Sequence, residues 1–187
     1  WGVAVASKFL AVGAVVPWAR AGAGAVATQS FANTAYGPQA LMLMGRGLPA
    51  EETLRRLVRD DAEHALRQVG LVDAQGNAAT FTGEGCFDWA GGLTGPGFAI
   101  QGNILVGAQV VEAMAEAFTR TAGPLPGRLY AALLAGDRAG GDRRGRQSAA
   151  LYLAKPAGGY GGFNDRWMDL RVDDHEDPVR RLGELLR

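Results

Sequence analysis

The chain has 187 residues, of which 48% are hydrophobic and 20% are charged, and 19 Lys and Arg residues balance 19 Asp and Glu residues. This length and apolar content predict one packed domain over residues 1–187. The balanced charge argues against a basic nucleic-acid-binding protein and against a disordered acidic chain.

Cys86 is the only cysteine, so the chain cannot form an internal disulfide. No apolar run reaches the roughly 18 residues that a membrane-spanning helix needs, and no segment has the shape of a secretory signal. We therefore expect a cytoplasmic protein with neither a membrane nor a nucleic-acid partner.

Small and β-branched residues dominate the first thirty positions and predict strands at 2–7, 14–19 and 24–30. Because the apolar character of these segments is continuous rather than alternating, both faces of the strands should be covered. A short helix should follow at 38–44.

A longer helix is predicted at 50–67, where leucine, valine and alanine residues recur at helical spacing behind two glutamates. The pattern also allows a break near Asp60-Asp61. Residues 71–81 predict a hairpin with its turn at Gln75–Asn77. Residues 83–97 should form a Gly-rich loop, of a length that is often functional. The remaining predicted elements are a strand at 98–105, helices at 108–120 and 125–136, strands at 148–154 and 169–173, and a helix at 178–186.

Strands and helices that follow one another in such blocks predict an α+β fold. Helices should cover two packed sheets in stacked layers, unlike the arrangement in a doubly wound parallel sheet. Strand 1–7 should be central and should pair with segments near 24–30 and 148–154.

Large aromatic residues in loops and at strand ends often serve interfaces. Four fall in such predicted positions, namely Trp18, Trp89, Tyr160 and Trp167. We therefore expect a homodimer.

Two polar segments are candidates for chemistry. Gln101-Gly102-Asn103 interrupts an apolar strand, which costs stability unless the polar groups are paired. The segment therefore serves either a function or an internal hydrogen-bond network. Asp142 lies near glycines between a helix and a strand, where the backbone can approach closely and a carboxylate can orient a catalytic group. The alternative is a solvated loop.

Asp173, Asp174 and His175 begin a run of five ionisable residues that ends at Asp177. Carboxylate oxygens in such a run can ligate a divalent cation. We favour the other interpretation, a polar strand end that also caps the last helix, because adjacent residues rarely converge on one ion. No metal or cofactor is expected.

Several segments make the chain similar to one bacterial family. They are Val3–Phe9, Ala25–Ser30, Gln101–Asn103, Gly140–Asp142 with Gln147–Ala150, and Asp169–His175. On these motifs the chain, from Trp1 to Arg187, resembles domain of unknown function 1028, which is grouped with the N-terminal-nucleophile hydrolases. The resemblance implies a four-layer αββα sandwich and no known substrate.

N-terminal-nucleophile hydrolases use a Thr, Ser or Cys as their first residue. Its side chain attacks an amide carbonyl while its own α-amine acts as the base. Family members similar to this chain usually carry a short strand ahead of the position of Trp1, with a Thr just after the initiator Met. Because Trp1 cannot be the nucleophile, the resemblance implies a Thr upstream of it.

The looser similarity to proteasome-type β subunits implies a catalytic set of Lys8, Arg20, Ser30, Asn103 and Asp142. Lys8 and Arg20 would set the charge around the nucleophile. Ser30 and Asn103 would line the oxyanion side, and Asp142 would orient the amine. The implied substrate-binding residues are Ser7, Gln29, Gln101 and Ser148. The catalytic residues should border one cleft.

The resemblance thus implies hydrolysis of a C–N bond in a small amide, ureide or acylated amino compound. Ser7-Lys8 stands where the related architecture often has an Asp, which indicates an anionic substrate. The alternative is a non-catalytic αββα module that binds a small ligand or forms oligomers. The mass of the N-terminal peptide of the mature protein would discriminate between the two.

Overall fold

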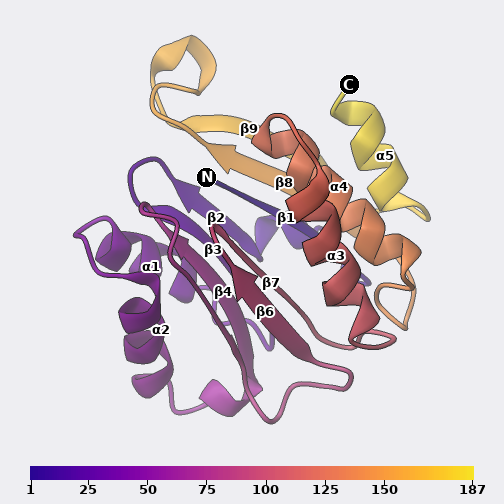
Figure 1. Cartoon of the computed structure of the whole chain (residues 1–187), viewed down its shortest axis with the longest axis horizontal. Coiled ribbons are helices and arrows are strands. Elements are labelled where there is room, and N and C mark those ends of the chain that lie inside the picture. Colours follow the sequence, from indigo (N-terminus) through magenta and orange to yellow (C-terminus); the bar gives the residue numbers. More distant parts are fainter.

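Nine strands in three sheets form the centre of the protein, in a computed structural model that describes residues 1–187 (Figure 1). The strands are β1 (Gly2–Ser7), β2 (Pro17–Arg20), β3 (Gly24–Ser30), β4 (Arg67–Asp73), β5 (Ala78–Thr82), β6 (Gly91–Gly95), β7 (Phe98–Gly102), β8 (Ser148–Ala154) and β9 (Arg166–Val172). The helices are α1 (Tyr36–Met44), α2 (Ala50–Arg59), α3 (Gln109–Arg120), α4 (Leu125–Arg138) and α5 (Pro178–Leu185). Every strand pair is antiparallel, so the fold is mixed α+β and not a doubly wound parallel sheet.

One sheet has three strands in the order β1-β8-β9, and α4 and α5 pack against it. Leu133 of α4 and Leu182 of α5 share an apolar cluster with Leu151 and Leu153 of β8. The expectation of a central first strand is wrong. Strand β1 lies at the edge of this sheet and pairs only with β8, because β3 belongs to the other sheet.

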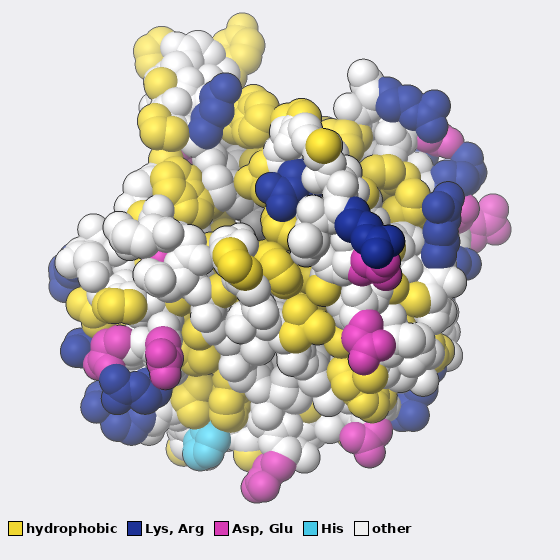
Figure 2. Space-filling view, viewed as in Figure 1, with side chains coloured by type: hydrophobic (Ala, Val, Ile, Leu, Met, Phe, Trp, Pro, Cys, Tyr) yellow, Lys and Arg dark blue, Asp and Glu magenta, His cyan; other side chains and the backbone are white.

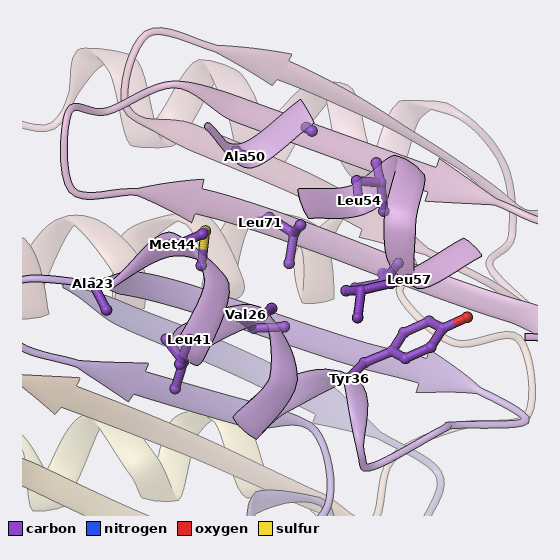
Figure 3. Packing of buried hydrophobic residues seen from close by; sticks show 12 residues of the cluster. Ala23, Val26, Tyr36, Leu41, Met44, Ala50, Leu54, Leu57 and Leu71 are labelled. Carbon is purple, nitrogen blue, oxygen red and sulfur yellow. The ribbon is translucent and has the colours of Figure 1, made fainter. Parts of the chain in front are cut away.

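The second sheet has four strands in the order β2-β3-β4-β5, and α1 and α2 cover it. Figure 3 shows Val26 of β3 and Leu71 of β4 beneath side chains of both helices, among them Met44 and Leu57. The ring of Tyr36 joins this cluster, while its hydroxyl points to one side, where it meets the carboxylate of Asp61 at 2.9 Å.

The two sheets meet through small side chains. Val3 of β1, Ala19 of β2, Ala25 of β3 and Ala154 of β8 form a buried cluster between them. The third sheet, the β6-β7 hairpin, lies against β4 and β5, and α3 packs on it. The strands therefore lie between α1 and α2 on one side and α3, α4 and α5 on the other (Figure 1).

The predicted helix at 50–67 ends at the break that its sequence allows near Asp60-Asp61, and its second half is wrong. Helix α2 ends at Arg59, and β4 already begins at Arg67, four residues before the predicted hairpin. The reason is Asp61, whose carboxylate accepts hydrogen bonds from Arg67 and from groups outside the helix. The turn at Gln75–Asn77 is confirmed, since Asp73 and Asn77 are joined by a backbone hydrogen bond of 3.0 Å.

The segment 83–97 is not a loop throughout, because it contains β6. The predicted strand at 98–105 ends early, at Gly102. The three later helices are confirmed within a few residues, and Asp177 caps α5 by accepting the backbone N–H of Arg180 at 3.4 Å. None of the helices is long and apolar enough to cross a membrane.

Residues 155–165, which we call the arm, connect β8 to β9 and project from the body (Figure 1). Tyr160 and Phe163 are 96% and 91% exposed. Figure 2 shows hydrophobic side chains gathered on the arm, whereas most charged side chains lie over the helices. The base of the arm is fixed to the body, because the Asp165 carboxylate accepts the backbone N–H of Ala21 at 2.8 Å.

Candidate functional site

A cavity of about 1370 Å³ runs along β1 and β7 and is lined by every residue of both strands. Residues of β3, α3 and α4 complete its walls, and most of the lining side chains are apolar. Neither β1 nor β7 pairs with a strand at its second edge. The cavity is therefore bounded by two open strand edges.

The hydrogen-bonding groups of the β1 edge follow from its pairing with β8. Trp1 and Ala154 exchange two backbone hydrogen bonds, of 3.0 and 2.9 Å. Because bonded and non-bonded pairs alternate along antiparallel strands, the other odd-numbered residues of β1 also bond to β8. Gly2, Ala4 and Ala6 therefore direct their N–H and C=O groups toward the open edge.

Asp142 lies where β1 and β7 both end. Its carboxylate accepts the backbone N–H of Lys8, the residue after β1, at 3.3 Å. Its backbone forms an antiparallel bridge with Leu105, shortly after β7, and the next residue, Arg143, donates its N–H to the carbonyl of Ile104 at 2.9 Å. One carboxylate is thus held at the end of the cavity, between the two strands.

Arg144 is the main hydrogen-bond partner of this carboxylate. The Asp142 side chain is 11% exposed and accepts the Arg144 backbone N–H, Nε and Nη2 at 2.9, 2.9 and 2.6 Å. Burial acts to raise the pKa of Asp142, but the donors of Arg144 and Lys8 outweigh it and hold the pKa below its ordinary value. Asp142 is therefore ionised at neutral pH and can accept hydrogen bonds from a cationic group.

Four amide side chains form a network beside the same end of the cavity. Gln29 of β3 and Asn103 both donate to Oε1 of Gln68, each at 3.1 Å. Gln101 of β7 donates to Oε1 of Gln29 at 3.3 Å, and the fully buried Gln68 donates to the carbonyl of Gly102 at 2.8 Å. The polar segment 101–103 is therefore part of an internal hydrogen-bond network that also lines the cavity.

Gly70 of β4 makes room for this network. A Cβ atom on Gly70 would overlap Oε1 of Gln101. A side chain at position 70 would therefore push Gln101 away from Gln29.

Ser30 ends β3 at the cavity with a φ of 65°, a left-handed conformation that costs free energy for residues other than glycine. Its hydroxyl oxygen is buried and has no hydrogen-bond partner. Buried polar groups are usually paired, so this unpartnered hydroxyl is an unusual feature of the cavity wall.

Seven of the nine expected site residues line the cavity, namely Ser7, Gln29, Ser30, Gln101, Asn103, Asp142 and Ser148. The hydroxyl of Ser148 is used internally, because it donates to the carbonyl of Phe9 and accepts the N–H of Val12. The Lys8 side chain is exposed beside the polar end of the cavity, with Nζ 3.2 Å from the carbonyl oxygen of Arg146.

Arg20 does not join the others, so the expected position of this residue is wrong. It lies at the end of β2 that pairs with Gly24, far along the strands from Ser30, and its Nη2 donates to the carbonyl of Leu41 at 2.6 Å. The element order alone placed Arg20 at the site. The pairing register of β2 with β3 puts it at the opposite end of the sheet.

Gln68 was not among the expected residues, although it connects the amide network. It follows directly after the helix expected at 50–67, where a glutamine gives no indication of a functional site. The signal that identifies it is the pairing of β3 with β4, which sets Gln68 opposite Gln29.

The side chains of Asp174 and His175 make hydrogen bonds within the protein. Gln147 donates to Asp174 at 3.3 Å, and Nδ1 of His175 accepts the backbone N–H of Asp177 at 2.8 Å. No three His, Cys, Asp or Glu side chains of the structure form a group that could hold a metal ion.

Comparison with known proteins places the chain beside proteins whose function is unknown. The sequence model of the DUF1028 family, described as a family of unknown function, matches residues 1–182. The crystal structure of a DUF1028 protein from Silicibacter pomeroyi is similar, with a TM-score of 0.89 and 32% sequence identity over 99% of this chain and 81% of that one. No curated protein matches.

Proposed function

Since this chain belongs to the DUF1028 family, a family of unknown function, we propose its function from the geometry of its cavity. The proposed activity is that of an N-terminal-nucleophile-type hydrolase that cleaves the C–N bond of a small amide. The layers would form the αββα sandwich of that type. The observation that carries the proposal is a cavity between two open strand edges, with an ionised carboxylate at its end.

The cavity suits one extended strand. Strand β1 has 6 residues and is therefore about 20 Å long, at about 3.3 Å per residue. A strand antiparallel to it would bond to Gly2, Ala4 and Ala6, and its first residue would lie beside Lys8 and Asp142. We assign this strand to residues that precede Trp1 in the full-length protein, with a threonine as the first residue and nucleophile.

The residues around that position would have distinct roles. The Asp142 carboxylate would accept a hydrogen bond from the α-amine and orient it, and an α-amine with a pKa of about 7.7–8.0 is a suitable base. Asn103 donates one amide hydrogen to Gln68 and keeps a second for an oxyanion. The unpartnered hydroxyl of Ser30 would supply another donor.

One observation favours the alternative, a module that binds a small ligand without catalysis. The amides of Gln29, Gln68 and Gln101 bond mainly to one another and to nearby carbonyls, and Arg144 occupies both oxygens of Asp142. Such a network holds a binding surface rigid without any reacting group.

Two measurements distinguish the hydrolase from the binding module, namely the identity of the first residue of the mature protein and the hydrolysis of small amides. We expect mass spectrometry of the mature full-length protein to find a threonine as its first residue. We also expect the protein to release amine from a panel of small acyl amides, and substitution of that threonine by alanine to abolish the release. A mature protein that begins at Trp1, or an alanine variant with full activity, would contradict the proposed hydrolase.

A further inference from the structure

The polar end of the cavity carries more positive than negative charge. Arg144 pairs with Asp142 at 2.6 Å, and Arg146 pairs with Asp137 at 2.5 Å. These two pairs leave no net charge. Two further cations lie nearby without a carboxylate within 4 Å, namely Arg138, which lines the cavity, and Lys8.

Lys8 is held beside the cavity by its backbone and by its side chain. Its N–H donates to Asp142, and its ammonium donates to the carbonyl of Arg146 at 3.2 Å. An ammonium has three hydrogens, so two remain for a ligand. Arg138 is the last residue of α4 and comes directly before the loop that carries Asp142.

Aromatic rings lie at the same end. Phe31 and Phe87 line the cavity, are 52% and 55% exposed, and have ring centroids 5.9 Å apart. Phe31 follows Ser30, and the carbonyl of Phe87 accepts the N–H of Ile104, next to Asn103. Exposed apolar side chains grouped at a cavity indicate a surface that contacts an apolar ligand.

These two observations together define one ligand chemistry. We infer that the site takes amides that carry a carboxylate on the amine side and an apolar or aromatic acyl group, that is, N-acylated amino acids. The carboxylate lies near Lys8 and Arg138, and the acyl group contacts Phe31 and Phe87. This inference rests on the proposed function, because it names the substrate class of the same site.

The reaction balances without a cofactor. The threonine oxygen bonds to the acyl carbon, the C–N bond breaks, and the hydroxyl proton passes by way of the α-amine to the leaving nitrogen. Water then cleaves the acyl ester, which returns the threonine and gives a carboxylic acid. The products are an apolar acid and a free amino acid.

The test compares N-phenylacetyl-leucine with N-phenylacetyl-leucinamide, which has the same scissile bond but no carboxylate. With the full-length protein, we expect kcat/KM for the acid to exceed that for the neutral compound by about 10- to 100-fold, as charge-assisted hydrogen bonds provide. The difference should shrink as the ionic strength rises. Equal values for the two compounds would overturn the inference and leave the hydrolase proposal standing.

A variant with both Lys8→Ala and Arg138→Ala should reduce this ratio by about 10-fold, mainly through KM. The matched control is Arg59→Ala, an exposed cation on α2 on the other side of the molecule, which should leave the ratio unchanged. An unchanged ratio in the double variant would contradict the assignment.

Calorimetric titration with both compounds keeps the inference testable if neither is hydrolysed. Absence of turnover would count against the hydrolase. Tighter binding of the acid would then still support the anionic site, and equal binding would overturn it.

Discussion

Asp142 lies at the point where an incoming first residue would meet β1 and β7, and its side chain already holds the backbone of Lys8 and the guanidinium of Arg144. Asp142→Asn keeps an acceptor oxygen at nearly the same volume but removes the charge. We therefore expect a loss of about 1 kcal/mol in the free energy of unfolding. Amide hydrolysis should fall by about 100-fold or more, because the α-amine loses its orienting charge.

Urea denaturation and initial-rate assays on the full-length protein check both parts. The control is Asp169→Asn on β9, where the carboxylate pairs with Arg171 at 2.7 Å and does not line the cavity. A variant of Asp142 that retains activity, or one that loses activity only because it unfolds, would contradict the proposed role.

Gly70→Ala tests the amide network without replacing any of its polar residues. The added Cβ would meet the side chain of Gln101, so Gln101 must leave Gln29 or β4 must shift. We expect a loss of about 1–3 kcal/mol in the free energy of unfolding, as in other overpacked interiors. Gly127→Ala on α4 is the control, since its Cβ would enter open space. Equal stability of the two variants would show that the network tolerates the displacement.

The sequence was informative about those site residues whose local setting is unusual. Asn103 interrupts an apolar segment and Asp142 follows two glycines, and both residues line the cavity. Gln68 gives no such signal, because a glutamine at the expected end of a helix is ordinary. Arg20 was misplaced, because the register between two strands decides which end of a sheet a residue occupies, and composition does not determine that register.

At the scale of elements, Asp61 joins α1 to the connection between α2 and β4. Its carboxylate accepts Nε of Arg67 at 2.9 Å, Nδ2 of Asn33 at 3.0 Å and the hydroxyl of Tyr36 at 2.9 Å. The bond from Arg67 is the main reason that the pKa of Asp61 lies well below its ordinary value, although burial opposes it. The ionised carboxylate thus stabilises the junction of α1, α2 and β4.

Because the pKa of Asp61 is lower in the folded than in the unfolded protein, its contribution to stability is present above an unfolded pKa of about 3.9 and disappears as the pH falls through the folded value. Asp61→Asn should therefore destabilise the protein by about 3 kcal/mol at pH 7. The difference between variant and parent should narrow below pH 4.

Urea denaturation at pH 7, 4 and 3 measures this difference. Asp60→Asn is the matched control, since its side chain is 63% exposed and its pair with Arg59 is open to solvent. A difference for Asp61→Asn that stays constant with pH would contradict the assignment of the charge.

Elements with a regular apolar pattern were predicted best, because that pattern is the face that they bury. Helices α3, α4 and α5 and strand β8 belong to this group. Strand β6 was missed, because its sequence Gly-Gly-Leu-Thr-Gly has little strand propensity and is held by its partner β7. Pairing between strands and the open edges of β1 and β7 come from the tertiary structure and are not encoded in any short segment.

At the scale of the whole molecule, the arm is where we expect a second copy to bind. Trp18 packs over Gly37 and Trp89 over Gly91, so both belong to the body, whereas Tyr160 remains exposed beside Phe163. If the protein is a homodimer, replacement of Tyr160 and Phe163 together by serine should convert it to a monomer, because two large aromatic contacts are lost.

Light scattering at micromolar concentration measures the mass of both proteins. Met42→Ser, which removes an apolar side chain that is 42% exposed on α1, should leave the dimer intact. A monomeric parent protein would count against the homodimer itself, and a dimeric double variant would exclude the arm as its interface.

The cavity along β1 and β7 also has a mechanical consequence. Its walls are mostly apolar and offer water few hydrogen-bond partners, so a strand in the cavity would replace weakly bound water by packed protein atoms. Hydrostatic pressure favours the state of smaller volume, and residues 1–187 alone should therefore unfold at a lower pressure than a protein whose cavity is filled by a strand.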